Sequence, residues 1–435
     1  MEKILVLGSD YGTIEIVKEA KKQGLYVIVA DYKETTPTKE LADEKWLVST
    51  PDIDKLEQLC ITNKISAIIT GASDFNINNS RKLCKRLGLP VYCSDDYAWK
   101  VSTDKYEFKK VCKSVGAPIA TDYCISESPS DDELERLIYP VVVKPVDKSG
   151  NKGMSYCSSK EELLAALKKA RSVSENPNII IERQLHGPEY AVNYLIANGE
   201  PQLFFFSAEH HQPGEAANLY SIINTTNYHL KQYIDEVNDK VIAVFKKAGL
   251  TEGIAWVECM LDDDGHFYLL EMGYRFGGEV VNIPYKDVCG FDSINWVLEC
   301  ATGKPHNPSM LPKKKYDYSG VAATYLLFTN KETTISRVGG LDKIAKLKNV
   351  LVDVTKRAGD KVMAYATMGT IRISAVNIYE LCEKIKAIND FITVEDDAGD
   401  NLIIKFDNYL ELIDEYEKGL SEFKKEKVLD GKIGG

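Results

Sequence analysis

The stretch Val141-Val142-Val143-Lys144-Pro145-Val146-Asp147-Lys148-Ser149-Gly150-Asn151-Lys152-Gly153 decides the fold of this chain. Three consecutive valines predict a buried strand, and Lys144 follows them, where a fixed backbone can aim its ammonium group at a phosphate. The glycine- and serine-bearing segment after it can close backbone N–H groups over a polyphosphate. The Gly-Lys-Ser/Thr of a P-loop is absent. Taken alone, the stretch fits a phosphate-binding loop and a solvated hairpin turn with incidental lysines equally well.

A second apolar strand further along the chain runs into acidic and polar residues. Ile179–Ile181 precede Glu182, and Arg183-Gln184-Leu185 then lead to Glu189. Backbone groups at the end of such a strand can pair with a purine edge, with Glu182 accepting from an exocyclic amine and Glu189 from ribose hydroxyls. Taken alone, the segment is better explained as a strand that ends in a polar surface loop.

A predicted β-hairpin over 255–271 carries two acids. The turn signal is Asp262-Asp263-Asp264-Gly265, and antiparallel pairing of its arms would place Glu258 and Glu271 on one patch. Neighbouring carboxylates repel each other unless a cation lies between them, and hard oxygen ligands suit Mg²⁺. Arg275 would add a bidentate clamp for an anion. The alternative is a surface hairpin with ordinary acids.

The N-terminal part of the chain predicts an open, largely parallel sheet. The strand Ile4–Leu7 is followed by the turn Gly8-Ser9-Asp10-Tyr11-Gly12, a helix, and a second strand that ends at Asp31. This alternation continues to about residue 95. Asp10 and Thr13 stand where a dinucleotide fingerprint has glycines. A tight strand-to-helix turn is therefore favoured over the nicotinamide site of an oxidoreductase.

Apolar periodicity predicts the remaining elements, including a hairpin turn at Asn198-Gly199. Strands are expected at 65–70, 91–93, 190–196, 322–328 and 370–374, and helices at 14–22, 53–63, 78–87, 105–115, 160–170, 235–248 and 408–427.

Composition excludes several classes of protein. The chain has 435 residues, of which 44% are hydrophobic and 27% charged, as expected for a multidomain globular protein. Its net charge of −11 argues against nucleic acid or anionic membrane as a partner, because both require a positive surface. The ten cysteines are scattered, without Cys-x-x-Cys pairs or zinc-ligand spacing to histidine, so a reducing, cytoplasmic compartment is expected.

In this order, the four segments resemble those of the ATP-grasp superfamily. The likeness is strongest to carboxylate–amine ligases related to L-amino-acid ligase, biotin carboxylase and the carbamoyl-phosphate synthase large chain, and it covers nearly the whole chain. It implies an α/β protein with the ATP-grasp fold. A pre-ATP-grasp domain with a parallel sheet is expected over 1–98. An α+β ATP-grasp domain follows over 99–310, with a lid over about 121–194, and a C-terminal domain over 311–435.

The resemblance also implies roles for individual residues. Those it places at ATP are Lys105, Lys144, Ser149 and Lys152 for the phosphates, Glu182, Arg183, Gln184 and Leu185 for the adenine, and Glu189 for the ribose. Glu258 and Glu271 match the two metal-bridging glutamates. Arg275 matches the arginine that holds the acyl phosphate or the transition state, so it is the predicted catalytic residue.

One position departs from the pattern of the superfamily, which usually has Glu-x-Asn-Pro-Arg after the second strand of the hairpin. Here the run is Glu271-Met272-Gly273-Tyr274-Arg275, and Gly273 cannot supply the amide oxygen expected at one Mg²⁺. Three alternatives follow: water or another side chain replaces that ligand, the second metal ion binds weakly, or catalysis has been lost.

The function implied by the resemblance is an ATP- and Mg²⁺-dependent ligase, with Mn²⁺ as an alternative ion. It would join a small-molecule carboxylate to an amine through an acyl phosphate, in one version forming a dipeptide; a homodimer is left open. The alternatives are a carboxylase or purine-biosynthesis-type ligase, and a non-catalytic ATP-binding protein. The segment Ala208–Gly214 is expected near the substrate, although His210 and His211 are each better explained as surface or packing residues.

Overall fold

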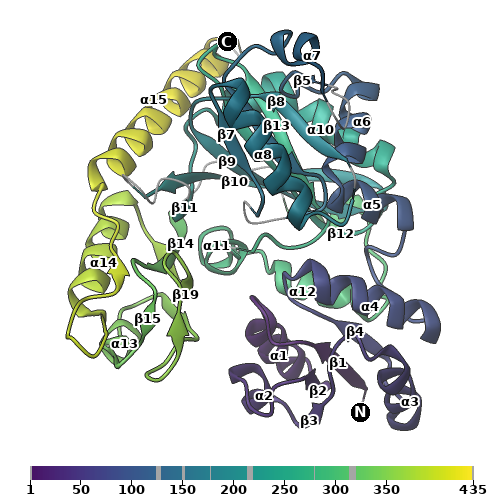
Figure 1. Ribbon diagram of the computed structural model, residues 1–435. Coiled ribbons are helices and arrows are strands. Elements are labelled where there is room, and N and C mark those ends of the chain that lie inside the picture. Colours follow the sequence, from purple (N-terminus) through teal and green to yellow (C-terminus); the bar gives the residue numbers. More distant parts are fainter. Residues whose placement is uncertain are drawn as a thin grey trace.

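The computed structural model describes residues 2–123, 129–148, 152–176, 178–212, 219–278, 280–312 and 320–433. Its N-terminal unit is a parallel sheet with the strand order β3-β2-β1-β4 (Figure 1). The two central strands are apolar runs with nearly every side chain buried, as expected where helices cover both faces. The elements are β1 Lys3–Leu7, α1 Thr13–Lys22, β2 Tyr26–Asp31, α2 Pro37–Leu41, β3 Glu44–Leu47, α3 Ile53–Asn63, β4 Ala67–Ile69, α4 Asp74–Leu87 and α5 Asp96–Thr103.

The turn between β1 and α1 is tight, as predicted. Gly8 and Gly12 have φ angles of 85° and 88°, in the left-handed region that favours glycine. The Asp10 carboxylate turns back onto α4, where it accepts a hydrogen bond of 2.8 Å from the side-chain amide of Asn76. The prediction of a strand at 91–93 is wrong: this segment forms a turn, and its apolar residues are used for packing against neighbouring elements rather than for a strand ladder.

The largest sheet is antiparallel and runs in the order β13-β12-β9-β10-β11-β14-β19-β17, with β21 paired to β14. Both predicted hairpins are present in it, β9 with β10 and β12 with β13. Its strands are β9 Glu189–Ala197, β10 Glu200–His211, β11 Tyr220–Thr225, β12 Gly253–Leu261, β13 Phe267–Gly273, β14 Val321–Thr329, β17 Val350–Val354, β19 Thr367–Ala375 and β21 Ile403–Ile404.

A smaller antiparallel sheet, in the order β5-β8-β6-β7, lies apart from the large one. Its apolar face packs against α8, so this layer has a hydrophobic core of its own. A bridge between Ile119 and Leu269 ties the chain near β5 to β13. The elements are α6 Lys105–Val115, β5 Asp122–Tyr123, α7 Asp131–Glu135, β6 Val141–Pro145, β7 Ser155–Cys157, α8 Lys160–Val173 and β8 Ile179–Arg183.

Helices between β11 and β14 cover the large sheet and connect it to the N-terminal unit. In Figure 1, α12 lies between the N-terminal unit and the large sheet, and it contacts α1, β4 and β12, whereas α11 packs against β14 and β19. These elements are α9 Leu230–Tyr233, a π-helical turn Ile234–Asn238, α10 Asp239–Ala248, α11 Asn282–Cys289, α12 Ser293–Ala301 and a 3₁₀ turn Pro308–Met310.

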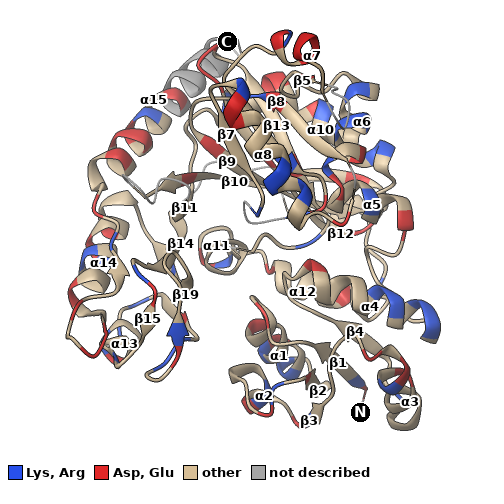
Figure 2. Ribbon diagram, in the orientation of Figure 1, with Lys and Arg blue, Asp and Glu red and all other residues tan. Residues whose placement is uncertain are grey.

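The C-terminal part of the chain adds strands to the large sheet, because β14 pairs with β11. The large sheet thus continues past residue 311, where the C-terminal domain was predicted to begin. Strand β9 also belongs to this sheet, although the lid was predicted to extend to about residue 194. The domain limits themselves stay a prediction. Figure 2 shows acidic residues spaced along α15. The elements are β15 Thr333–Thr334, β16 Arg337–Gly339, α13 Leu341–Ile344, β18 Lys361–Val362, α14 Ile378–Phe391, β20 Thr393–Glu395 and α15 Tyr409–Ile433.

Candidate active site

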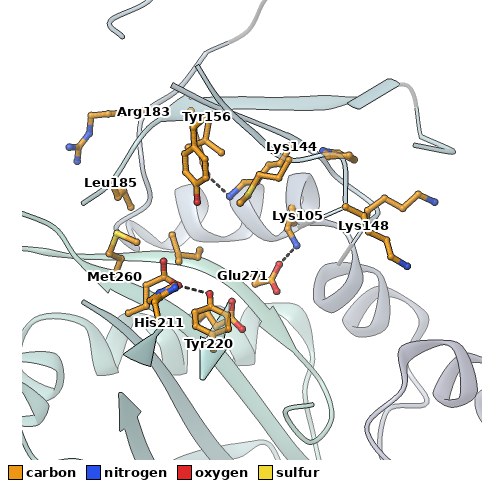
Figure 3. A pocket seen from close by; sticks show the side chains of 18 residues that line it. Lys105, Lys144, Lys148, Tyr156, Arg183, Leu185, His211, Tyr220, Met260 and Glu271 are labelled. Carbon is orange, nitrogen blue, oxygen red and sulfur yellow. Dashed lines mark hydrogen bonds and ion pairs between the residues drawn. The ribbon is translucent and has the colours of Figure 1, made fainter. Parts of the chain in front are cut away.

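A cleft lies between the small sheet and the large one (Figure 3). Residues from α6, β6, β8, β9, β12 and β13 converge on it, although they are far apart in the sequence. The sequence-predicted residues that line it are Lys105, Lys144, Lys152, Glu182, Arg183, Leu185, Glu189, Glu258 and Glu271. Gln184 and Arg275 are not among the lining residues, and Ser149 lies outside the described ranges.

Two lysines hold the carboxylate of Glu182. One oxygen pairs with Lys144 on the neighbouring strand β6, and the other pairs with Lys109 on α6. Burial alone would raise the pKa of Glu182, but the two ammonium groups lower it. This differs from the role expected of Glu182 as the acceptor for a purine amine, since both of its oxygens already bind ammonium groups.

Lys109 was missed by the sequence analysis, and its side chain is only 3% exposed. It lies one helical turn after Lys105, so the spacing on α6 was the available signal.

The chain after β8 forms one wall of the cleft. The backbone N–H groups of Arg183 and Gln184 donate to the carbonyls of Thr121 and Pro140, at 2.8 and 3.1 Å. The Arg183 guanidinium pairs with Asp262 at 2.7 Å, and Figure 3 shows it directed away from the lysines. Apolar side chains from both the small and the large sheet also line the cleft and would suit the faces of a planar base; they are Val142, Met154, Tyr156, Leu185, Met260 and Leu270.

Glu189 and two aromatic residues form the opposite rim. The Tyr220 hydroxyl on β11 donates to the Glu189 carboxylate at 2.6 Å, and the rings of Tyr220 and His211 lie 4.6 Å apart. His211 therefore lies in the cleft. Its neighbour His210 is buried on the other side of β10, where its Nδ1 lies 2.9 Å from Glu411 of α15. His210 is thus a packing residue that docks the C-terminal helix.

The two predicted metal ligands face each other across the hairpin. Glu258 on β12 and Glu271 on β13 are direct partners in the register, with a bulge immediately after Glu258. Glu271 also forms an ion pair with Lys105, at the N-terminus of α6, and Figure 3 shows the two side chains directed at one another. Burial, and then the charge of Lys144, lower the pKa of Lys105 to about 8. Carboxylates and lysines thus share one enclosed space.

Arg275 lies in an adjoining hollow that shares Lys105, Lys148 and Glu271 with the cleft. Its guanidinium forms a bidentate pair with Asp74, at 2.5 and 2.9 Å, and stacks over the ring of Trp256 with 5.1 Å to the centroid. Asp74 begins α4 of the N-terminal unit, so this contact joins two parts of the chain. The sequence analysis did not identify Asp74.

The structure gives a steric reason for Gly273. It is the cross-strand partner of Trp256, and a Cβ atom at this position would overlap the indole ring. A side chain that reached the metal site from position 273 would require Trp256 to move. Trp256, which stacks on Arg275, therefore occupies the space that an asparagine side chain at position 273 would need.

Residues 137–283 match the family model of the ATP-grasp domain. The chain contains an ATP-grasp domain. The matched range holds Lys144, Glu182, the two hairpin glutamates and Arg275, whereas Lys105 precedes it.

Known proteins are similar to different shares of the chain. D-alanine–D-alanine ligase B of Pseudomonas putida is 29% identical over 203 residues, covering 44% of this chain and 60% of that protein. The carbamoyl phosphate synthase large chain of Clostridium botulinum is 25% identical over 312 residues, covering 66% of this chain and 28% of that protein. The chain thus spans no more than 60% of the length of these relatives.

Solved structures confirm the ATP-grasp fold. L-amino acid ligase from Bacillus licheniformis superposes with a TM-score of 0.74 at 20% identity, over 91% of this chain and 99% of that one. Biotin carboxylase from Campylobacter jejuni superposes with a TM-score of 0.73 at 16% identity, over 92% of each chain. The predicted fold class is therefore confirmed.

Proposed function

We propose that this protein is an ATP- and Mg²⁺-dependent ligase that joins a small-molecule carboxylate to an amine through an acyl phosphate. The observation that carries the proposal is the convergence of Lys105 and Lys144 with Glu258 and Glu271 in one cleft. Lysines supply positive charge for a polyphosphate, and paired carboxylates suit a hard cation that also binds phosphate oxygens. D-alanine–D-alanine ligase and L-amino acid ligase among the similar proteins support this class.

ATP would lie with its base against the apolar wall near Leu185 and its ribose at Glu189. Its phosphates would extend toward Lys144, Lys105 and Lys152, because these side chains line the same cleft. To bind them, Lys105 exchanges the Glu271 carboxylate for a phosphate. Because Glu182 already pairs with Lys144, we assign it to holding that lysine in place rather than to the base.

Glu258 and Glu271 fit a magnesium site, because their directly opposed carboxylates are hard oxygen donors. When bound, Mg²⁺ offsets the charge of the phosphates and polarises the transferring group. Arg275 would stabilise the negative charge that develops as the substrate carboxylate attacks the γ-phosphate. That attack releases ADP and gives the acyl phosphate. The amine then attacks the acyl carbon, displaces inorganic phosphate and loses a proton, which gives the amide.

The test is a pairwise screen of carboxylates and amines with the full chain, ATP and Mg²⁺. Phosphate release is measured together with the mass of the product. A productive pair should lose activity by about a hundredfold in Arg275→Ala, with ATP binding retained. Lys113→Met is the control, because Lys113 is exposed and pairs with Asp122. Unchanged turnover in Arg275→Ala would refute the role of that residue.

A non-catalytic ATP-binding protein is the second candidate, and Gly273 is the observation that favours it. Position 273 supplies no side-chain ligand, and the space beside it is filled by Trp256. In the same screen, ATP binding without phosphate release from any pair supports this candidate and contradicts the ligase. Release that depends on bicarbonate supports a carboxylase or a purine-biosynthesis-type ligase instead.

We place the protein in a reducing, cytoplasmic compartment. Among the described residues all nine cysteines are free thiols, and all but Cys289 are buried. No helix in the described ranges is long and apolar enough to cross a membrane. The partners proposed are small molecules, in keeping with a cleft lined by lysines, carboxylates and apolar side chains.

A further inference from the structure

Three residues that could ligate a metal ion come together away from the cleft. Cys300 lies near the end of α12, His306 follows in the next loop, and Glu252 directly precedes β12. The His306 Nδ1 atom lies 3.5 Å from the Cys300 Sγ and 3.4 Å from the Glu252 Oε2. All three candidate ligand atoms lie within 4.8 Å of one another, and the His306 side chain is fully buried.

The surroundings of His306 orient its ring for ligation. On the far side of the ring, Nε2 lies 3.2 Å from the carboxylate of Glu299. A proton on Nε2 that is donated to Glu299 leaves the lone pair of Nδ1 directed at Cys300 and Glu252. A carboxylate behind a histidine in this way is the usual second partner of a metal-binding imidazole. Trp296 stacks on the ring at 3.6 Å and 12°, which fixes its plane.

One oxygen of the Glu252 carboxylate has no hydrogen-bond donor among the described residues. Its Oε1 accepts a hydrogen bond from the backbone N–H of Asn198 at 3.1 Å. Its Oε2 is buried and accepts no hydrogen bond from any residue within the described ranges. A buried carboxylate oxygen beside a nitrogen lone pair is unfavourable unless a cation or a proton lies between them.

We propose that Glu252, Cys300 and His306 bind a Zn²⁺ ion, with water as the fourth ligand. One oxygen, one sulfur and one nitrogen donor suit a borderline-soft ion and not Mg²⁺. With Zn–S bonds of about 2.3 Å and Zn–N or Zn–O bonds of about 2.0 Å, tetrahedral geometry separates nitrogen from sulfur by about 3.5 Å and nitrogen from oxygen by about 3.3 Å. The observed separations are 3.5 and 3.4 Å. Glu252 is 31% exposed, which leaves access for the ion and its water.

The site is separate from the cleft, and its proposed effect is to tie α12 to the start of β12. Glu252, directly before β12, and Glu258, within it, lie six residues apart, which corresponds to roughly 20 Å of extended chain. Zinc would clamp the start of the strand that carries Glu258 to the end of α12. The same helix already contacts that strand start through a 3.0 Å hydrogen bond from the Trp296 indole to the Gly253 carbonyl. The proposal is independent of the proposed ligase activity.

A doubly protonated His306 is the competing explanation. An imidazolium would bridge Glu252 and Glu299, with Cys300 as a neutral thiol. Both explanations make His306 structural, so stability measurements on a single variant do not separate them. Metal content and metal dependence do.

The experiment uses the full chain with Cys289, the exposed cysteine among the described residues, replaced by serine, so that metal binding by this thiol is removed. Protein purified without chelator is desalted in excess Mg²⁺, and its zinc is measured by mass spectrometry. We expect about one Zn²⁺ per chain, as for a structural site. Cys300→Ser and His306→Asn should abolish it, whereas Cys382→Ser, a buried cysteine in the C-terminal part, should retain it.

Spectroscopy and unfolding provide second readouts. After chelation, Co²⁺ should produce a thiolate charge-transfer band that Cys300→Ser lacks, together with a fluorescence change from Trp296. Zinc should raise the Tm of the chelated chain and of Cys382→Ser, but not that of the ligand variants. Absence of bound zinc and of a zinc-dependent Tm would overturn the proposal in favour of the imidazolium bridge. Zinc that persists in both ligand variants would overturn it in favour of binding elsewhere.

Discussion

Lys109 offers the sharpest test of how the cleft is built, because it touches the proposed phosphate site only through Glu182. Its side chain is 3% exposed and that of Glu182 is 6% exposed, so the pair is shielded from water. Replacing Lys109 with methionine keeps the length and apolar stem of the side chain and removes its charge. Glu182 then keeps Lys144 as its remaining ion-pair partner among the described residues.

The expected loss of stability follows from this burial. Removing one member of a buried ion pair costs about 3 to 5 kcal/mol, because the remaining charge stays desolvated. Lys144 still compensates Glu182, so we expect the lower end, about 3 kcal/mol. For a domain of about 150 to 250 residues, a loss of about 3 kcal/mol lowers the Tm by roughly 6 to 12 °C. ATP binding should weaken by about tenfold, because Lys144 becomes more firmly held by Glu182 and less available to a phosphate.

The assay combines thermal unfolding with an ATP-binding titration on the same preparations. Lys113→Met is the matched control, since it lies on the same helix, is 56% exposed, and should change stability by less than about 1 kcal/mol. The double variant Lys109→Met/Glu182→Gln should be more stable than the sum of the single effects predicts, because no carboxylate is then left undercompensated.

A Lys109→Met protein with the Tm of the control would refute the ion-pair account of this cluster. Normal ATP affinity despite the lower Tm would refute only the coupling through Lys144. The two outcomes are therefore separable, and the first does not depend on the proposed function.

Three further predictions concern other contacts. Because the pKa of Lys105 is about 8, ATP affinity should fall as the pH rises through that value and should stay constant in Lys105→Arg, as binding titrations between pH 7 and 9 would show; a parallel fall in both proteins would contradict this. Gly273→Asn should cost about 1 to 3 kcal/mol by overpacking, and less in a Trp256→Ala background, measured by denaturant unfolding; equal costs in both backgrounds would contradict the steric account. Burial lowers the pKa of His210 but contact with Glu411 raises it above its ordinary value, so the pair stabilises the fold below about pH 6.5 and loses this effect as the pH rises through the folded-state pKa. The effect should be no more than about 1 kcal/mol, because Glu411 is partly exposed, and Glu411→Gln should flatten the pH dependence of the Tm; an unchanged slope would count against the pair.

The local sequence was sufficient to predict the helices and strands that carry the candidate site. The turn sequence of the β12–β13 hairpin fixes the register as far as Cys259 opposite Leu269. A bulge between Glu258 and Cys259 then shifts the pairing by one residue, and this shift, which the sequence did not predict, places Glu258 opposite Glu271. The helix that begins at Lys105 was predicted with its observed limits, since Asp104 caps it and Gly116 ends it. The prediction of a strand at 91–93 was wrong because apolar residues fit a strand and a packed turn equally well.

Only the tertiary structure decided which charges meet. The pairing of Glu182 with Lys109, the clamp of Asp74 on Arg275, and the approach of Glu252 to Cys300 and His306 all join segments far apart in the chain. The periodicity of apolar residues predicts which face of a helix or strand is buried. It does not predict which element packs against that face, because this depends on how whole layers pack together. The sequence by itself therefore determined most of the elements, and it predicted candidate residues for phosphate and metal, most of which line one cleft. The fold decided that Lys109 joins Lys144 at Glu182, that Trp256 fills the space at position 273, and that Glu252, Cys300 and His306 meet.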